Sequence, residues 1–208
     1  MQDDLPFGRT QVSVGELRQY IDDEDAIKNG ERGGVICPEY RINLFVTELP
    51  SLLAWLGENG REYPWRYTTD PWKVYASEIL LQRTRGDAVA EVYDKFFSQF
   101  PTIESLNQAT EEEIREVVHT LGFVNQRSRT LREVGEIFCE NHDCEIPDSL
   151  EELKRPWRVG DYSARACQLF ARGTPYALVD TNFARVIGRI LGYEMPQQPH
   201  KSKKVYEL

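Results

Sequence analysis

Apolar residues recur every three to four positions from Tyr40 onward, which is the spacing of helices that bury one face. An early stripe of this kind contains Pro50, where we expect a kink or a break. The alternation typical of half-buried strands is nearly absent. The pattern predicts an all-α fold of about eight to ten helices joined by short loops. The clearest stripe consists of Val89, Val92, Tyr93, Phe96, Phe97 and Phe100.

Capping chemistry marks where several helices begin and end. Asp70 followed by Pro71 is typical of an N-cap and a first helical residue, and predicts a helix over 70–81. Two capping boxes are expected, at Thr110 with Glu113 and at Ser149 with Glu152. Other helices are predicted over 126–140 and 161–172, and from the N-cap Asp180 to Gly192.

Two stretches fall outside the helical pattern. Residues 1–38 are weakly patterned and contain a glycine-rich loop, so we expect an N-terminal extension that need not be rigid. Residues 156–160, with the sequence PWRVG, form a tight connection between two short helices.

The charge distribution leaves nucleic acid open as a partner. The formal net charge of −9 weighs mildly against it, because phosphate contacts need a positive face. Arginine and lysine nevertheless concentrate between residues 127 and 172, so a local basic surface is expected. The chain has no apolar run of about eighteen residues and no secretory signal pattern. We therefore expect no membrane partner and a cytoplasmic location, at the nucleoid or, in a eukaryote, in the nucleus.

The cysteines Cys37, Cys139, Cys144 and Cys167 carry no metal-binding signature. No two of them have the C-x-x-C spacing that zinc and iron–sulfur ligands use. We therefore expect isolated buried thiols in a reducing compartment and no metal site.

Three places have chemistry that a helical core does not require. Asp180 precedes a helix, where backbone amides and the helix dipole favour a charged carboxylate; the alternative is an ordinary N-cap. Glu78 lies in an apolar helix, where it is either buried, at a cost of roughly several kcal/mol when charged, or exposed on the polar face. The helix start after Gly160, near Arg158 and Arg165, either binds phosphate or belongs to a simple helical hairpin.

Several short segments together carry a recognisable signature. They are 64–66 (PWR), 70–74 (DPWKV), 77–82 (SEILLQ), 121–127 (LGFVNQR), 159–166 (VGDYSARA), 170–173 (FARG) and 179–186 (VDTNFARV). In order and spacing they resemble the helix-hairpin-helix DNA glycosylases, a family that includes endonuclease III, adenine glycosylases and thymine glycosylases acting on G·T mismatches. The resemblance runs from about Leu52 to Leu208.

The resemblance implies a two-lobed helical fold with a DNA-binding cleft between the lobes. Residues 39–76 with 190–208 would form a terminal lobe, and residues 77–189 a helical core that contains the hairpin 156–160. Double-stranded DNA would be the partner and the protein would be a monomer.

The resemblance also assigns catalytic roles. Asp180 matches the essential aspartate, which would stabilise the sugar cation or orient water. Tyr162 stands where strand-cleaving members have a lysine; because tyrosine cannot form a Schiff base, the enzyme should be monofunctional and leave an abasic site. Glu78 matches the carboxylate with which adenine glycosylases protonate the leaving purine. Asn182 matches a polar residue near the essential aspartate.

Base flipping would depend on residues that enter the duplex. Gln82 matches a residue that fills the gap left by the flipped base, and Phe123, or Leu121 beside it, is expected to supply a second wedge. The other positions expected to contact DNA are Arg83, Arg85, Gln126, Arg127, Arg158, Val159, Gly160 and Arg165.

The motifs favour one target base without excluding others. Adenine glycosylases usually read DGN and QQT where this chain reads DTN at 180–182 and QRT at 82–84, so we favour thymine or uracil opposite guanine. The alternative is an adenine glycosylase acting on A·G or A·8-oxoguanine. An alternative of another class is a non-catalytic DNA-binding remnant of the family.

Two departures from the family pattern favour the remnant, whereas Asp180 and Tyr162 oppose it. The family hairpin reads Leu-Pro-Gly-Val-Gly, and Arg158 replaces its first glycine, so we expect a reshaped hairpin in which the Arg158 side chain contacts phosphate. Many relatives end in four cysteines that hold a [4Fe–4S] cluster, and this sequence stops at Leu208 before that region. We therefore expect no cofactor, in a C-terminal part that is either truncated or naturally without the cluster.

Overall fold

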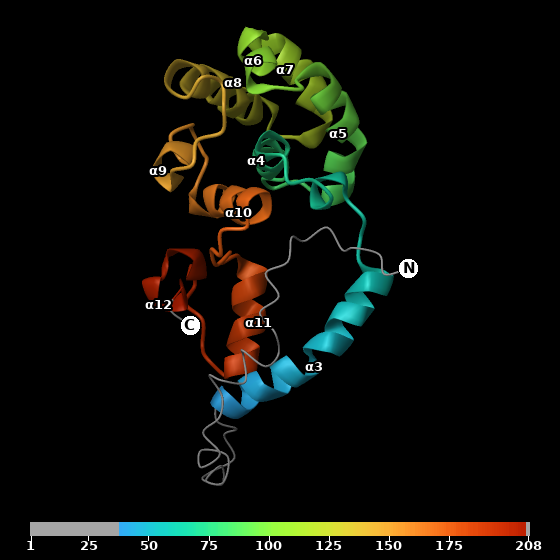
Figure 1. The fold of residues 1–208 in the computed structure, drawn as a ribbon, viewed down its shortest axis with the longest axis vertical. Coiled ribbons are helices and arrows are strands. Elements are labelled where there is room, and N and C mark those ends of the chain that lie inside the picture. Colours follow the sequence, from blue (N-terminus) through green and yellow to red (C-terminus); the bar gives the residue numbers. More distant parts are fainter. Residues whose placement is uncertain (1–37, 207–208) are drawn as a thin grey trace. The chain divides into compact units, whose positions relative to one another are not determined.

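The computed structural model describes residues 38–206, with the side chains of all but residues 38–46, 48 and 191 (Figure 1). Every regular element in this range is a helix, which confirms the all-α prediction. The α-helices are α3 (Pro38–Asn59), α4 (Pro71–Leu80), α5 (Gly86–Gln99), α6 (Ile103–Gln108), α7 (Glu111–Val118), α8 (Val124–Asn141), α9 (Leu150–Leu153), α10 (Asp161–Arg172), α11 (Thr181–Leu191) and α12 (Lys203–Tyr206). Short 3-10 helices are η1 (Pro64–Arg66), η2 (His119–Leu121) and η3 (Pro199–Lys201).

The expected N-terminal extension over 1–38 lies outside the described residues except for Pro38, which begins α3. Within the described range, no helix combines the length and the apolar composition needed to cross a membrane.

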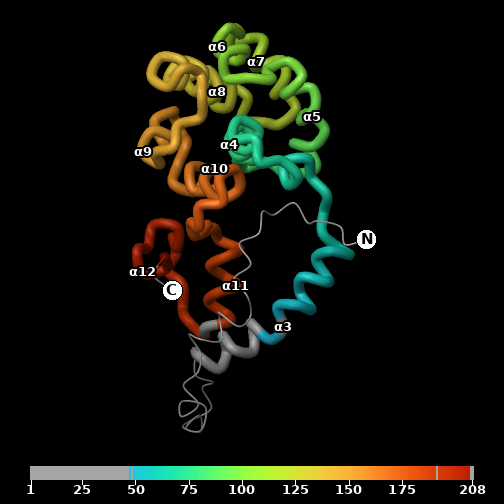
Figure 2. Tube along the Cα trace, in the orientation of Figure 1, coloured from blue at the N-terminus to red at the C-terminus, as the bar shows by residue number. Residues whose placement is uncertain are grey.

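The chain divides into two compact units, and their boundaries differ from the expected ones. Unit 1 contains the described residues 38–61 and 179–206, and unit 2 contains residues 62–178. The expected divisions lay after residues 76 and 189. The segment with α4 belongs to unit 2 because α4 packs against α5, α8 and α10, and α11 belongs to unit 1 because it packs against α3 (Figure 2).

Unit 2 is built around α4, which Figure 1 shows among α5, α8 and α10. Tyr75 of α4 is fully buried, and its hydroxyl donates to the Leu153 carbonyl at 2.7 Å. The Trp72 ring packs against Phe96 and Phe97 from the predicted stripe of α5. Because aromatic side chains bury large areas, these contacts help to fix α4 within the core of unit 2.

Two of the predicted helix starts have the expected capping bonds. The Asp70 carboxylate accepts hydrogen bonds from the amides of Trp72 at 2.9 Å and Lys73 at 3.2 Å. At the start of α7, the Thr110 amide donates to the Glu113 carboxylate at 2.7 Å, and the Thr110 hydroxyl accepts from the Glu113 amide at 3.3 Å. These bonds confirm the N-cap of α4 and the capping box of α7.

The capping box predicted at Ser149 is wrong in its second half. The Ser149 hydroxyl accepts from the Glu151 amide at 3.2 Å, so the residue does cap α9. The Glu152 carboxylate instead contacts Arg155 at 2.8 Å and His142 at 3.0 Å. Two basic partners on neighbouring elements compete successfully for a carboxylate that the local pattern assigned to the cap.

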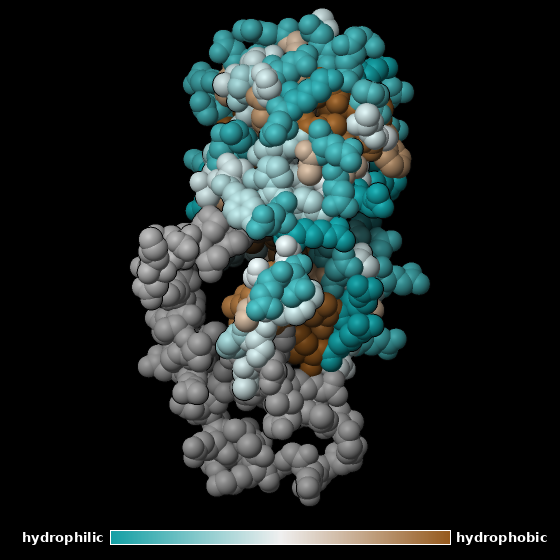
Figure 3. Space-filling view, turned by 90° about the vertical axis from the view of Figure 1, so that its right-hand side faces the viewer, coloured by the Kyte–Doolittle hydropathy of each residue, from teal (hydrophilic) through white to brown (hydrophobic). Residues whose placement is uncertain are grey.

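Unit 1 pairs α11 with α3, and part of its apolar surface is exposed. α3 continues through Pro50, so the alternative of a break there is wrong; the helical residues on both sides outweigh one missing backbone hydrogen bond. A small buried cluster joins Val179, Ala184 and Val205. Figure 3 shows hydrophobic surface on this unit, in brown in the lower half of the view. The exposed large apolar side chains of the two helices are Leu52, Leu53, Trp55, Leu56, Phe183 and Val186.

Two of the cysteines are bonded, which corrects the expectation of isolated thiols. Cys139 in the last turn of α8 forms a disulfide with Cys144. The chain turns back at Asp143 and Cys144, with φ angles of 51° and 59°, and this turn brings the two cysteine Cα atoms within 3.8 Å. Cys167 in α10 is free and buried, and burial raises the pKa of its thiol to about 12.

Candidate active site

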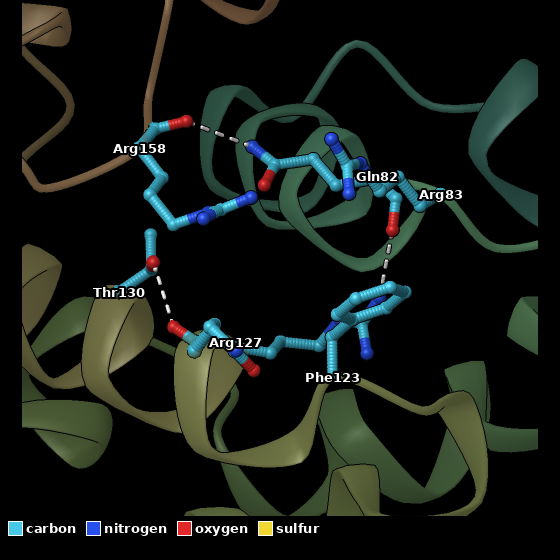
Figure 4. Close-up of a pocket in the computed structure, with 7 residues that line it drawn as sticks. Gln82, Arg83, Phe123, Arg127, Thr130 and Arg158 are labelled. Carbon is cyan, nitrogen blue, oxygen red and sulfur yellow. Dashed lines mark hydrogen bonds between the residues drawn. The ribbon is translucent and has the colours of Figure 1, made fainter.

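A small pocket opens in unit 2 where α4 ends, where α8 begins and where the hairpin 156–160 passes (Figure 4). Three elements that are far apart in the sequence therefore contribute to one site. The lining residues are Gln82, Arg83, Phe123, Gln126, Arg127, Thr130 and Arg158, and all except Thr130 were predicted as DNA-contacting positions.

Gln82 links the end of α4 to the hairpin. Its side-chain amide donates to the Arg158 carbonyl at 3.2 Å, as Figure 4 shows. The Gln82 carbonyl accepts from the Arg127 guanidinium at 3.0 Å. The side chain predicted to enter the base stack is thus half-buried and held beside the pocket before any ligand is present.

Arg83 and Phe123 project from two turns that share an unusual backbone conformation. Their φ angles are 54° and 48°, in the left-handed region that non-glycine residues rarely adopt. Both side chains are exposed, Phe123 to 49 %, and the Arg83 guanidinium lies 5.7 Å from the centre of the Phe123 ring. Such a conformation persists only where the surroundings impose it, and it tends to occur at functional sites.

Two residues that were predicted to contact DNA, Leu121 and Arg127, have buried side chains. Leu121 is 6 % exposed and belongs to the core of unit 2, so Phe123 rather than Leu121 is available as a wedge. Arg127 is 4 % exposed, and its guanidinium donates to protein oxygens. A helix places successive side chains on different faces, and sequence motifs alone do not say which face is covered.

The hairpin keeps the backbone shape expected of a glycine-containing turn. Arg158, which replaces the first family glycine, has a φ of 62°, so the expected reshaping at this position is wrong. The Arg158 guanidinium lies 5.3 Å from the centre of the Trp157 ring, and Arg129 lies 4.4 Å from the same ring. The Trp157 amide also donates to Glu133 at 2.8 Å. These contacts hold a strained turn in place.

Val159 and Gly160 complete the hairpin in different ways. Val159 is 6 % exposed and packs into the core, so only its backbone could face a ligand. Gly160 is exposed, and a Cβ built there would meet no atom within 4 Å. The protein itself therefore does not require a glycine at this point, and the open space leaves room for a ligand backbone to approach.

Glu78 has the most strongly perturbed carboxyl group of the site. It lies in the last turn of α4 and is half-buried. Burial raises the pKa of its carboxyl group from 4.5 to about 7, because low-dielectric surroundings penalise the charged form. The group can therefore carry a proton at neutral pH, which suits a general acid.

The remaining predicted residues of unit 2 lie near helix starts or on α10. Tyr162, in the first turn of α10, is 39 % exposed. Arg165, one turn later, places its guanidinium 5.4 Å from the centre of the Tyr176 ring. Arg85 is exposed and precedes α5 as its N-cap residue. Gln126 in the first turn of α8 is half-buried and lines the pocket.

The predicted catalytic aspartate belongs to unit 1. Asp180 caps α11, and its Oδ1 accepts from the Phe183 amide at 2.6 Å. Its Oδ2 lies 3.4 Å from the Asn182 side-chain amide, and the Asn182 oxygen in turn accepts from Arg185 at 3.2 Å. The carboxylate thus has a fixed orientation and remains half-buried.

Sequence reasoning missed Thr84, Thr130, Arg129 and Glu133. Thr130 lines the pocket, and its hydroxyl donates to the Gln126 carbonyl at 2.9 Å. Thr84 accepts from Arg127 at 2.7 Å. Only the Gln-Arg-Thr-Arg cluster at 82–85 hinted at Thr84, and nothing in the local sequence distinguishes the other three.

The described residues do not fit the [4Fe–4S] cluster that the family resemblance raises as a question. Cys139 and Cys144 are bonded to each other, and Cys167 is single and buried. Within 38–206, no group of three or more histidine, cysteine or carboxylate side chains is placed to hold a metal ion.

Comparisons with known proteins identify relatives of this chain. Residues 76–207 match the HhH-GPD superfamily of base excision DNA repair proteins. The chain is 35 % identical over 157 residues to a thymine-DNA glycosylase of Aeropyrum pernix, and the aligned region covers 74 % of this chain and 70 % of the relative. It is 31 % identical over 158 residues to a thymine/uracil-DNA glycosylase of Methanothermobacter thermautotrophicus, covering 76 % of this chain and 72 % of the relative.

The fold has the same relatives. The solved structure of a thermostable thymine-DNA glycosylase superposes with a TM-score of 0.69 at 28 % identity, covering 80 % of this chain and 76 % of that one. The residues that match the family model, 76–207, include α4 from Ala76, the hairpin, α10 with Tyr162, and Asp180 with the helix α11 that it caps. The chain therefore belongs to the HhH-GPD superfamily of base excision DNA repair proteins.

Proposed function

We propose that this protein is a monofunctional DNA glycosylase that acts as a monomer on double-stranded DNA and removes thymine or uracil mispaired with guanine. The observation that carries the proposal is the oriented carboxylate of Asp180, which caps α11 in the segment that matches the family's essential aspartate. The relatives named as thymine and thymine/uracil glycosylases support the choice of base.

Asp180 would stabilise the charge that develops as the base departs. When the N-glycosidic bond breaks, its electron pair leaves with the base, and the deoxyribose becomes a cation centred on C1′. A carboxylate whose direction is already fixed by the Phe183 amide needs no reorganisation to meet that charge. Water then adds to C1′, and the proton that it releases neutralises the departed base, which completes the hydrolysis, while Asn182 keeps the second carboxylate oxygen in place.

Tyr162 supports the monofunctional assignment. A lysine at this position would attack C1′ through its amine, form a Schiff base and open a route to strand cleavage. A phenol has no such nitrogen, so the reaction should stop at an abasic site. The exposed position of Tyr162 in the first turn of α10 leaves it accessible to a sugar.

The pocket residues would drive base flipping. Gln82 and the exposed Phe123 lie on adjacent turns, where they could fill the space that the flipped base leaves. Extrusion costs a few kcal/mol, roughly, and less for a mispaired base, so this step itself favours mismatches.

One observation keeps adenine as a second candidate substrate. Glu78, with its pKa raised to about 7, can hold a proton at neutral pH and donate it to a departing purine. The same proton could assist a departing pyrimidine, so Glu78 alone does not choose between the two bases.

The test is a panel of end-labelled duplexes that carry G·T, G·U, A·G and A·8-oxoguanine, each incubated with the protein and then treated with alkali or left untreated. We expect cleavage after alkali in the G·T and G·U duplexes, and no cleavage without alkali. Asp180→Asn should abolish the product, whereas the control Asp94→Asn, at an exposed position of α5, should retain it.

Each other outcome changes a specific part of the proposal. Cleavage without alkali would contradict the monofunctional assignment. Product from the adenine duplexes alone would replace the pyrimidine substrate with adenine. Absence of product from every duplex, together with retained DNA binding, would indicate a non-catalytic DNA-binding protein.

A further inference from the structure

Arg127 is buried where the two turns that line the pocket meet (Figure 4). Its side chain is 4 % exposed although it is charged, and burial lowers the pKa of its guanidinium to about 10. A guanidinium has five N–H donors and no acceptor, so it is tolerated inside a protein only where several oxygens converge on it. The arrangement of those oxygens shows what the residue does.

The acceptors come from both turns. On the turn after α4, Nη2 donates to the Leu80 carbonyl at 3.2 Å, to the Gln82 carbonyl at 3.0 Å and to the Thr84 hydroxyl at 2.7 Å. On the turn before α8, Nη1 donates to the Gly122 carbonyl. One side chain therefore joins two segments that are about forty residues apart in the sequence.

Two of these acceptors, the carbonyls of Leu80 and Gln82, lie at the C-terminal end of α4 and in the turn that follows it. The last carbonyls of an α-helix lack intrahelical donors and carry the negative end of the helix dipole, so a cation is favoured there. Arg127 fills this role for α4 from a different helix. The Thr84 hydroxyl, 3.1 Å from the Leu121 carbonyl, adds a second bridge between the same two turns.

Each turn contains a left-handed residue directly after the carbonyl that Arg127 binds. The Gln82 carbonyl belongs to the peptide bond before Arg83, whose φ is 54°. The Gly122 carbonyl belongs to the peptide bond before Phe123, whose φ is 48°. Non-glycine residues keep such angles only when their surroundings impose them, and Arg127 fixes the peptide before each one.

We propose that Arg127 is a positioning residue for base flipping. It holds the turn that carries Gln82 and the turn that carries Phe123 at one fixed separation, so that both side chains enter the duplex together. The inference rests on the proposed function, because it assigns a cause to the wedge that the proposed function uses. Arg127 itself touches no substrate in this role.

The test uses Arg127→Lys, which keeps the charge but replaces the planar fork with one ammonium that cannot reach both turns. Thr84→Val is the second variant, since it removes the hydroxyl bridge to the Leu121 carbonyl and one of the four acceptors of Arg127, while the other three remain. Arg132→Lys is the matched control. Arg132 lies on the same helix and likewise donates to carbonyls at the C-terminal end of a neighbouring helix, those of Asn107 at 3.1 Å and Ala109 at 2.6 Å near the end of α6, but it lies outside the pocket.

Two measurements separate positioning from general stability. The first is the single-turnover excision rate on a G·U duplex at saturating protein, together with the Kd for the same duplex. The second is the fluorescence of 2-aminopurine placed beside the mismatched base, measured in an Asp180→Asn background. This signal rises when the base stack opens and needs no chemistry, so it can be read even if the proposed reaction is absent.

For Arg127→Lys we expect the excision rate to fall about tenfold or more and the 2-aminopurine amplitude to fall with it, while Kd changes less than about threefold. Thr84→Val should show the same pattern to a smaller extent. Arg132→Lys should lower the melting temperature comparably and leave both the rate and the amplitude unchanged.

An unchanged amplitude in Arg127→Lys, or an equal loss in Arg132→Lys, would overturn the inference and leave Arg127 with a purely structural role. If the unmodified protein excises no base yet opens the stack in an Arg127-dependent manner, the proposed function fails and the positioning role survives.

Discussion

Ionisation of Glu78 should reduce the stability of this protein as the pH rises, and Glu78→Gln should remove that effect. Burial raises the pKa of the folded-state carboxyl group from 4.5 to about 7. Between these two values the folded state binds more protons than the unfolded state, so the free energy of unfolding falls with increasing pH. The stabilisation is complete below about pH 4.5 and is lost as the pH passes through about 7.

The size of the effect follows from the shift. One pKa unit corresponds to about 1.4 kcal/mol, so the full shift of Glu78 is worth about 3 kcal/mol. Between about pH 5 and about pH 8 the expected loss is about 2 to 3 kcal/mol, because part of the unfolded-state ionisation already occurs below pH 5. Glutamine has a similar shape and no charge, so the stability of Glu78→Gln should not fall in this way. The free energy of unfolding of Glu78→Gln minus that of the parent should therefore be larger at pH 8 than at pH 5 by about this amount.

The assay is urea unfolding of the parent, Glu78→Gln and a control at both pH values. Glu91→Gln is the control, since Glu91 is an exposed carboxylate on α5. The difference between the two pH values cancels any direct effect of the amide on packing. If the stability difference between Glu78→Gln and the parent were the same at pH 5 and pH 8, Glu78 would ionise as freely as in the unfolded chain. The general-acid role would then lose its physical basis.

Three further predictions concern the backbone. Arg158→Gly relieves a φ of 62° but removes a contact with Trp157, so the free energy of unfolding in urea should change by less than about 1 kcal/mol. The salt dependence of DNA binding, measured by fluorescence anisotropy, should lose about one unit of slope, and an unchanged slope would mean that Arg158 contacts no phosphate. Thr110→Ala removes half of the capping box of α7 and should cost about 1 kcal/mol by the same unfolding assay, and an unaltered midpoint would show that water replaces the cap. Gly135→Ala places a Cβ 2.9 Å from the Asn107 Cα and should lower the free energy of unfolding by about 1 to 3 kcal/mol. The control Gly57→Ala has open space around the new Cβ and should not lower it, so equal effects of the two variants would contradict the close packing of α6 on α8.

Features that depend on a few adjacent residues could be predicted from the sequence. The cap at Asp70 and the capping box at Thr110 follow from side chains that reach the backbone within three residues, and α10 ends at Gly173 because glycine readily adopts the φ of 69° found there. Asp180 belongs to the same class, because its contact with the Phe183 amide is local. The candidate catalytic carboxylate was therefore accessible to reasoning from the sequence.

Features that depend on the three-dimensional path of the chain between or around helices could not be predicted. The Cys139–Cys144 disulfide depends on how the chain turns after α8, and its spacing carries no motif. The raised pKa of Glu78 depends on how deeply α4 is surrounded, which an apolar pattern suggests but does not measure. The predicted bond from Glu152 back to the Ser149 amide is absent because the Glu152 carboxylate contacts His142 and Arg155 instead.

Arg127 shows why counting basic residues gives a poor picture of a DNA-binding face. In sequence Arg127 belongs, with Arg158, to the basic region 127–172, and the segment 121–127 resembles the family. In the structure its donors are directed at the carbonyls of two turns, so its charge stabilises a shape and does not face solvent. Arg83 and Arg158 remain exposed at the pocket of a chain whose net charge is −9. Long-range attraction to phosphate is therefore weak, and recognition of a mispair should depend mainly on how rigidly Gln82 and Phe123 are presented to the base stack.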